Sequence, residues 1–282
     1  MKIINLVENT SGNFACRAVH GLSFYIQTKK HRILFDAGPD SALIENAAHL
    51  GIDLSLIDTV ILSHGHYDHS GGLMEFARLN KNAVIYMQSS AGEDHFAFDG
   101  PDKGYRYIGI DRDILSLPQV KLIDGDLKID EELSLFRIDK RTYPLPSTNK
   151  RIMLRKKEGE TFSYIQDDFV HEHCLLLESE GKKIIISGCA HNGILNIMDE
   201  YQRKHKEEKA PDAVISGFHL MKKSGYTEED YKEEEEIAGL LKAWPCKFYT
   251  CHCTGEEVFE RMKAVMKDQL LYVHCGDEVT LL

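Results

Sequence analysis

The chain has 282 residues, of which 43% are hydrophobic and 28% charged, as expected for a soluble globular protein of one large or two small domains. Its formal net charge of −11 argues against nucleic acid or an anionic membrane as main partner, since both need a basic surface. We expect no transmembrane helix and no signal peptide, because the long apolar runs that both require are absent. The seven cysteines, an odd number at low density, predict reduced thiols and a cytoplasmic location.

Apolar periodicity predicts strands and helices along most of the chain. The expected strands cover residues 2–7, 22–28, 31–38, 57–63, 83–88, 171–179, 182–191, 212–220 and 247–253. The expected helices cover residues 41–52, 71–79, 194–208, 228–244 and 256–267. Strands clustered early, with helices interleaved in both halves, favour an α/β fold with two packed sheets covered by helices. We therefore predict a four-layer αββα sandwich that forms a single domain over residues 1–282.

Two polar segments, residues 88–112 and 140–168, interrupt this pattern and are expected to be irregular insertions. The first mixes Gly, Asp and aromatic residues without a sustained period, and we interpret it as an excursion or a lid over a site. The second is locally basic. It is either a solvated surface loop or a wall that meets an anionic substrate.

Four metal-ligand side chains crowd the loop "SHGHYDH" that leaves the apolar strand 57–63. His64 and His66 lie two apart in an extended segment, so their imidazoles can converge on one cation. Asp68 and His69 follow on a turn and can face a second cation, at the about 3.5–4 Å separation usual for metal pairs. A structural role explains this density of ligands poorly, so we predict half of a two-metal site here.

Other strand ends have to supply the remaining ligands, because one loop cannot surround a metal ion. The apolar run at 184–186 leads to Cys189 and His191 in "GCAH". The strand at 247–253 ends at His252, between Cys251 and Cys253. If His252 points into the site, strand alternation turns both cysteines away, which predicts buried thiols rather than ligands.

The motif "HGHYDH" matches the H-x-H-x-D-H signature of the metallo-β-lactamase superfamily, and "ILFDAG" resembles that family's strand ending in Asp-x-Gly. More narrowly, "GCAHNGILN", "GFHL" and "HCTG" resemble the branch of metal-dependent hydrolases related to dihydropterin-linked ribofuranosylaminobenzene 5′-phosphate synthases. The resemblance spans the chain from "ILFDAG" to "HCTG" and implies a dinuclear hydrolase on the four-layer fold.

The resemblance also implies roles for individual residues. It assigns His64 and His66 to the first metal, and Asp68, His69 and His252 to the second. Many family members carry Gly-Asp where this chain has Gly188-Cys189, so Cys189 would ligate as a thiolate, as in zinc β-lactamases. His191 would instead supply the imidazole that usually comes from an earlier motif. We favour His191 over Cys189 and keep both.

The remaining polar residues near strand ends are weaker candidates. Asp168, His171 and His173 are alternatives for completing the site, although a role at the strand edge suits each of them better. His219, in "SGFHL", is expected to contact substrate or move a proton. The other histidines are expected to be surface or packing residues: His20, His31, His49, His95, His205 and His274.

The ligand types favour two divalent ions, with zinc first and manganese or iron as alternatives. Such a pair supplies hydroxide at neutral pH, and Asp68 would orient that nucleophile while ligating. The expected activity is hydrolysis of a small, anionic ester, phosphoester or amide, including a reaction on a pterin or ribosyl phosphate. The alternative is a metal-binding or regulatory protein without activity. The family's di-iron redox branch does not fit, because His66 replaces its glutamate.

Overall fold

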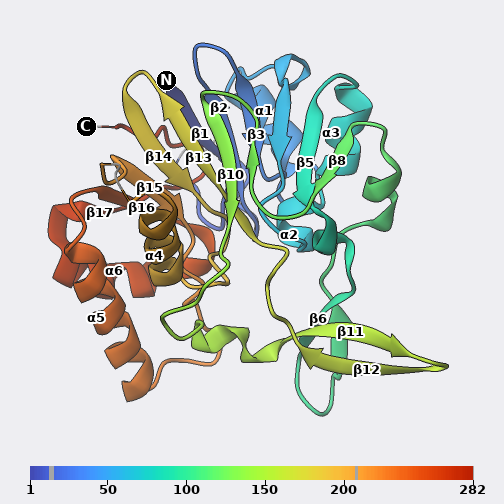
Figure 1. Cartoon of the computed structure of the whole chain (residues 1–282), viewed down its shortest axis with the longest axis vertical. Coiled ribbons are helices and arrows are strands. Elements are labelled where there is room, and N and C mark those ends of the chain that lie inside the picture. The colour runs from blue at the N-terminus through green and yellow to red at the C-terminus, as the bar shows by residue number, and fades with distance from the viewer. Residues whose placement is uncertain (13–15, 207–208, 282) are drawn as a thin grey trace.

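The computed structural model describes residues 1–12, 16–206 and 209–281 and contains two large sheets flanked by helices (Figure 1). The first sheet has the order β1-β2-β3-β4-β5-β8: Lys2–Val7, Ser23–Gln27, Arg32–Phe35, Thr59–Ile61, Val84–Gln88 and Val120–Ile123. The second has the order β17-β16-β15-β14-β13-β10-β9: Leu270–Tyr272, Lys247–Thr250, Ala213–Ser216, Lys182–Ile186, His173–Ser179, Leu133–Arg137 and Leu127–Lys128. The helices are α1, α2, α3, α4, α5 and α6: Ala42–His49, Tyr67–Ser70, Leu73–Leu79, Ile194–Lys204, Glu228–Lys242 and Glu256–Met266.

Three apolar layers confirm the predicted αββα sandwich. Between the sheets, inward residues of both pack together, among them Phe24, Phe35 and Leu175. The outer face of the first sheet packs against α1 and α3, whereas that of the second packs against α4, α5 and α6. The central strands therefore bury both of their faces, which explains the apolar runs of β4, β13 and β14.

The expected strands and helices are all present within the predicted ranges, and all but the first strand, 2–7, are shorter than predicted. The helix expected over residues 194–208 ends at Lys204, and positions 207–208 of that prediction lie outside the described residues. Apolar periodicity did not predict the short strands β8, β9 and β17, nor β10. Among the described residues, none of the helices combines the length and the apolar character needed to cross a bilayer.

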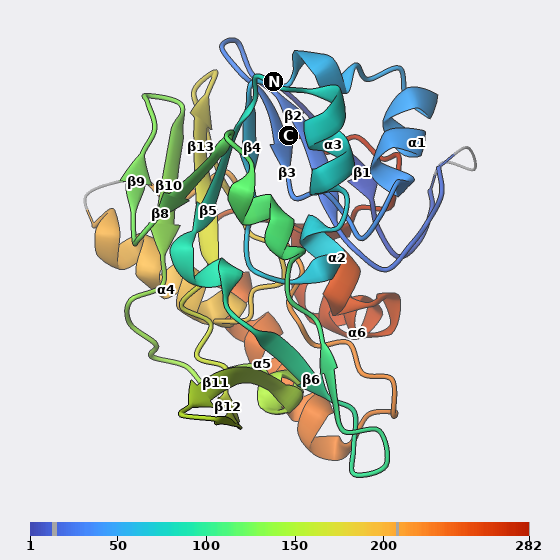
Figure 2. The ribbon, with the colours of Figure 1, turned by 90° about the vertical axis from the view of Figure 1, so that its right-hand side faces the viewer.

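The expectation that residues 88–112 and 140–168 are irregular was wrong. They contain the four strands of a third sheet, in the order β12-β11-β6-β7: Thr161–Gln166, Ile152–Glu158, His95–Phe98 and Tyr105–Tyr107. These strands are short, and the pairing that joins the two segments, β6 with β11, is distant in sequence, so neither segment shows a period by itself. Figures 1 and 2 show this sheet beyond one edge of the sandwich.

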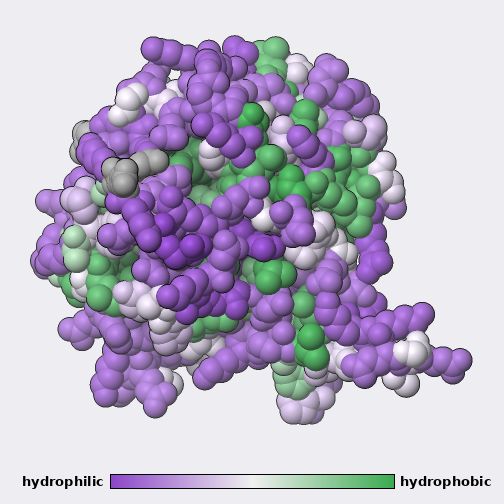
Figure 3. All heavy atoms as spheres, viewed as in Figure 1, coloured by the Kyte–Doolittle hydropathy of each residue, from purple (hydrophilic) through white to green (hydrophobic). Residues whose placement is uncertain are grey.

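The third sheet has two different faces. The aromatic residues of one face contact each other, as in the stacked rings of Tyr105 and Tyr164, 3.6 Å apart. The other face carries His95 and Ile152, which are buried. The tip of the β11–β12 hairpin is hydrophilic and solvent-exposed (Figure 3). The third sheet therefore places one buried face, including His95, against the edge of the sandwich.

Parallel pairing brings the functional loops to this same edge. Strands β3, β4 and β5 are parallel neighbours in the first sheet, as are β14, β15 and β16 in the second. The carboxyl ends of parallel strands meet at one edge, which is the usual position of a site in such folds. The residues after β3, β4, β14, β15 and β16 are therefore neighbours in space.

One partly exposed contact gives a prediction for the pH dependence of stability. The His31 ring hydrogen-bonds Asp58 at 2.8 Å and Asp130 at 2.6 Å, joining loops of the two sheets. Partial burial lowers the pKa of His31, but these carboxylates raise it further, so the net pKa lies above 6.5. The contribution to stability is full below pH 6.5 and is lost as pH rises through the raised pKa.

The variant His31→Gln should therefore lose less than about 1 kcal/mol at pH 6, and less still at pH 8. Urea unfolding of parent and variant at both pH values measures the difference. The same difference at both pH values would contradict the proposed ion pairs.

Candidate metal centre

Three buried imidazoles form the first group of candidate ligands. The ring centroids of His64, His66 and His191 lie 4.6 to 4.8 Å apart in all three pairings. The Nε2 atom of each ring is buried without a hydrogen-bond partner among the described residues. Burial, followed by neighbouring imidazoles, lowers the pKa of each ring well below 6.5, which favours the neutral form that binds metals.

The opposite ring nitrogens of His64 and His191 are held in place. Nδ1 of His64 lies 2.8 Å from the Ser63 hydroxyl, and Nδ1 of His191 lies 3.0 Å from Oδ1 of Asn149. The buried Glu172 carboxylate accepts the backbone N–H groups of His191 at 2.7 Å and of Asn192 at 2.8 Å. These contacts fix the turn after β14 and aim Nε2 of His191 at the group.

Asp68, His69 and His252 form a second group. An Asp68 oxygen lies 3.5 Å from Nε2 of His252, and the rings of His69 and His252 are 5.0 Å apart. Nδ1 of His252 lies 2.9 Å from the Asn9 amide oxygen. Nδ1 of His69 donates to the buried Asp36 at 2.7 Å. Burial lowers the pKa of His69, but Asp36 more than offsets this and raises it to about 9, so a cation at Nε2 must displace a proton.

Cys189 lies between the two groups. Its Sγ is 3.1 Å from Nε2 of His69. It also lies within 4.8 Å of ligand atoms of His64 and His191 on one side, and of His69 and His252 on the other. Burial raises the pKa of this thiol well above its ordinary value of 9.0. The sulfur therefore lies within reach of both groups.

The structure contradicts the prediction that Cys253 points away from the site. A ligand atom of Cys253 lies within 4.8 Å of Cys189 and His219. Strand alternation fails here because β16 ends at Thr250 and the 3₁₀ turn His252–Thr254 follows, with a φ of 48° at His252. Cys251 agrees with the prediction, since it is buried between the two sheets.

His219 lies just after β15, at the strand exit where it was predicted, with its ring 4.1 Å from that of His191. Its Nδ1 atom is buried without a hydrogen-bond partner among the described residues. The side chain therefore borders the first group, and contact with substrate stays a prediction.

The three alternatives near residue 170 are placed differently. Asp168 is exposed, and Nδ1 of the buried His173 lies 3.1 Å from the Gln88 amide instead of facing the groups. His171 does face His66, at a ring distance of 5.4 Å. However, Nδ1 of His171 accepts the Gly65 N–H at 3.0 Å, so the neutral ring carries its proton on Nε2. That tautomer cannot offer a metal a lone pair from Nε2.

His95 was expected to be a surface or packing residue, and it is instead buried beside His66, at a ring distance of 5.5 Å. Its Nδ1 donates to Asp167 at 2.7 Å. Burial raises the pKa of Asp167, but His171 and His95 hold it well below its ordinary range. The four residues form one buried cluster: His66, His95, Asp167 and His171.

His20 was also expected to be a surface or packing residue. It is exposed, but its Nε2 lies 3.3 Å from Asp68, and its ring is 4.8 Å from that of His252. It therefore stands at the solvent side of the second group. No sequence motif points to His20, because it precedes β2 and lies long before the histidine-rich loop after β4.

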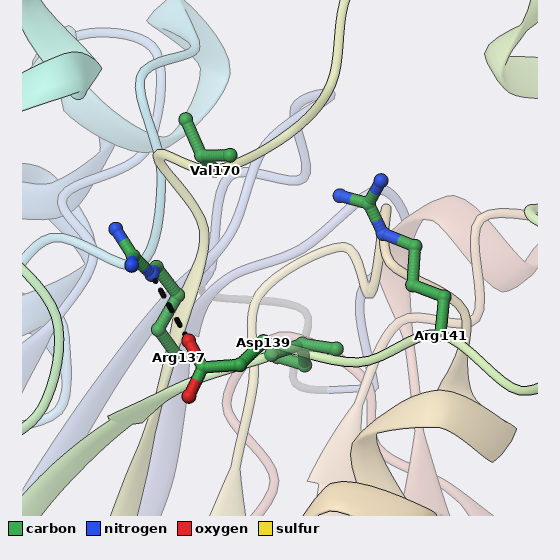
Figure 4. A pocket seen from close by; sticks show the side chains of 5 residues that line it. Arg137, Asp139, Arg141 and Val170 are labelled. Carbon is green, nitrogen blue, oxygen red and sulfur yellow. Dashed lines mark hydrogen bonds and ion pairs between the residues drawn. The ribbon is translucent and has the colours of Figure 1, made fainter.

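A hollow of about 550 Å³ lies beside Val170, the residue before His171. Arg137, Arg141 and Val170 line it, and both guanidinium groups point to the side where Val170 lies (Figure 4). Arg137 is paired with carboxylates, whereas Nε of Arg141 donates to Asn192, the residue after His191, at 2.8 Å. Arg141 therefore joins this hollow to the turn that holds His191.

Comparisons with known proteins agree with this architecture. Residues 16–149 match the family model described as metallo-beta-lactamase superfamily. Two proteins of Methanocaldococcus jannaschii are similar over nearly the whole chain. The uncharacterized protein MJ0448 is 31% identical, covering 96% of each chain. A 7,8-dihydropterin-6-methyl-4-(beta-D-ribofuranosyl)-aminobenzene-5′-phosphate synthase is 29% identical, covering 98% of this chain and 95% of the relative.

Solved structures extend the likeness to three dimensions. Tm1679, a metal-dependent hydrolase of the beta-lactamase superfamily, is 25% identical with a TM-score of 0.81, covering 99% of this chain and 98% of the other. Zn²⁺-bound PqqB from Methylobacterium extorquens shares the fold at 14% identity, with a TM-score of 0.58 and full coverage of both chains. The fold, the sequence matches and the histidine-rich strand ends lead to one conclusion: the chain belongs to the metallo-β-lactamase superfamily.

Proposed function

We propose that the protein is a metal-dependent hydrolase that uses at least two divalent cations on a small, anionic ester, phosphoester or amide. The observation that carries the proposal is the pair of ligand groups at the sandwich edge. Nε2 of His64, His66, His191 and His252 is buried without a partner among the described residues, and leaving buried polar atoms unpaired is costly. A cation in each group would satisfy these atoms, so the residues fit the metals that the family implies.

The first cation would be held by His64, His66 and His191, and the second by Asp68, His69 and His252. Imidazole and carboxylate ligands favour zinc, with manganese and iron as alternatives, and a thiolate at Cys189, which lies between the two groups, would favour zinc further. Bound at this edge, such cations lower the pKa of water to about 7 and stabilise the negative charge that develops on a carbonyl or phosphoryl oxygen.

The protein's own side chains would orient the substrate. Oδ2 of Asp68 lies near both His252 and the solvent-facing His20, which leaves Oδ1 of the same carboxylate to orient a nucleophile while Oδ2 ligates. His219 lies beside His191, where its imidazole can contact substrate or move a proton. Arg141, held by Asn192, offers a guanidinium to an anionic group at the hollow next to this turn.

The relative named as a dihydropterin-linked ribofuranosylaminobenzene 5′-phosphate synthase supports a substrate with a pterin or ribosyl phosphate part. Its name as a synthase also supports transfer chemistry at the same centre. We therefore place pterin and ribosyl phosphate compounds first among the substrates to be tested, followed by phosphodiesters, lactones and thioesters.

Removal of the metals tests the proposal. Purified protein should contain at least two divalent cations per chain, and dialysis against a chelator should abolish turnover of any substrate found in that panel. Adding zinc or manganese back should restore it. Elemental analysis and initial rates before and after dialysis measure both effects.

Turnover that survives complete removal of the metals would refute the mechanism. Bound metal with no turnover on any member of the panel would favour the alternative function, a non-catalytic metal-binding or regulatory protein.

A further inference from the structure

Two thiols and an imidazole form a third cluster at the sandwich edge. Cys189, His219 and Cys253 follow the adjacent parallel strands β14, β15 and β16. One ligand atom of each residue lies within 4.8 Å of those of the other two. Two cysteines and a histidine are a ligand set that zinc prefers, and three protein ligands leave one position open.

The polar atoms of this cluster suit a bound cation. Nδ1 of His219 is buried and has no hydrogen-bond partner among the described residues. Sγ of Cys253 accepts the backbone N–H of His219 at 3.3 Å, a contact that stabilises charge on a thiolate. The cluster thus combines an unpaired ring nitrogen with a sulfur that already faces a backbone donor.

The absence of a side chain at Gly217 leaves room for Sγ of Cys253. A Cβ atom on Gly217 would lie 2.4 Å from Sγ of Cys253, so only glycine fits at this position without displacing the thiol. Cys253 itself is 5% exposed and Cys189 is 3% exposed. Both cysteine side chains are therefore buried and closely packed beside the two groups of histidines.

Three sets of ligands lie side by side at the centre, and Cys189 of the third set also lies within 4.8 Å of ligand atoms in the other two. The first consists of His64, His66 and His191, and the second of Asp68, His69 and His252. The third consists of Cys189, His219 and Cys253. Nitrogen and oxygen ligands make up the first two sets, whereas the third is rich in sulfur, so it selects softer cations.

We propose that Cys189, His219 and Cys253 form a third cation position, selective for thiophilic divalent ions of the zinc and cadmium class. It lies next to the two positions of the proposed function, which does not require it. A cation there would join the loops after β14, β15 and β16 and place positive charge beside His191.

Cadmium binding tests the proposal, because cadmium–thiolate bonds absorb in the ultraviolet whereas cadmium–imidazole bonds do not. Metal-free full-length protein is titrated with Cd²⁺, and the absorbance and the bound metal per chain are measured. Compared with the parent, Cys253→Ala should lose about half of the thiolate absorbance and about one cation per chain. Cys251→Ala is the matched control, since this neighbouring cysteine is buried between the sheets, and it should match the parent.

A second variant keeps the test decisive if Cys253→Ala does not fold. His219→Gln removes the nitrogen ligand but neither thiol, so the absorbance should persist while cadmium affinity at the sulfur-containing position falls about 10-fold or more. Unchanged metal content and absorbance in Cys253→Ala, or unchanged affinity in His219→Gln, would overturn the proposal. A disulfide between Cys189 and Cys253 in metal-loaded protein would overturn it as well.

The result also separates this proposal from the proposed function. If His66→Ala lowers the metal content and Cys253→Ala does not, the third position is refuted and the two-metal hydrolase stands. If only Cys253→Ala lowers it, the third position stands and the two-metal hydrolase fails.

Discussion

Replacing His66 with alanine should reduce both bound metal and turnover more than any other single change at the centre. Its ring packs against His64 and His191, at 4.6 and 4.7 Å, and it also borders the buried cluster around His95. Even residues that only orient metal ligands cost about 10–100-fold in metal affinity or activity when they are changed. Loss of a direct ligand should therefore cost more than about 100-fold in turnover.

Two measurements check this prediction: metal per chain by elemental analysis, and kcat/KM on any substrate identified. His49→Ala is a suitable control, because His49 is an exposed residue at the end of α1. It should keep the metal content and the rate of the parent. A His66→Ala protein that folds, retains two cations and turns over at the parental rate would exclude His66 as a ligand.

The sandwich could be predicted because its central strands are buried on both faces. Residues of β4, β13 and β14 form continuous apolar runs, and helices with one apolar face follow several of the strands. The third sheet could not be predicted this way. His95–Phe98 is four residues long, and it pairs with Ile152–Leu154, more than fifty positions later. Such pairing depends on tertiary contacts that no local pattern encodes.

The candidate ligands were predicted where residue type and strand position agreed. His64, His66, Asp68, His69, Cys189, His191 and His252 all lie at the sandwich edge, although their role as ligands stays a prediction. Cys253 was assigned wrongly, because alternation assumes that the strand continues, whereas His252 adopts a positive φ of 48°. His95 was missed because its strand was not recognised. Asp167 was missed because its exposed neighbour Asp168 was chosen as the candidate for completing the site.

Replacing Asp36 with alanine should destabilise the fold and weaken the second cation position at once. This fully buried carboxylate accepts the backbone N–H and the hydroxyl of Ser63, and Nδ1–H of His69, each at 2.7 Å. Alanine leaves all three donors unpaired in a buried place. We expect the free energy of unfolding to fall by about 3 kcal/mol or more. Metal affinity at His69 should fall by about 10–100-fold, because its ring loses the partner that orients it.

Urea unfolding of metal-free protein isolates the effect on the fold, and zinc titration of folded protein measures the effect on the site. Asp36→Asn should be milder, since its amide keeps one oxygen acceptor for the Ser63 donors. The nearby Asp40→Ala removes an exposed partner of Arg17 and should cost less than about 1 kcal/mol. If Asp36→Ala lowers stability but leaves zinc affinity at the parental value, Asp36 supports the loop after β4 without orienting a metal ligand, and His69 has to be withdrawn from the second group.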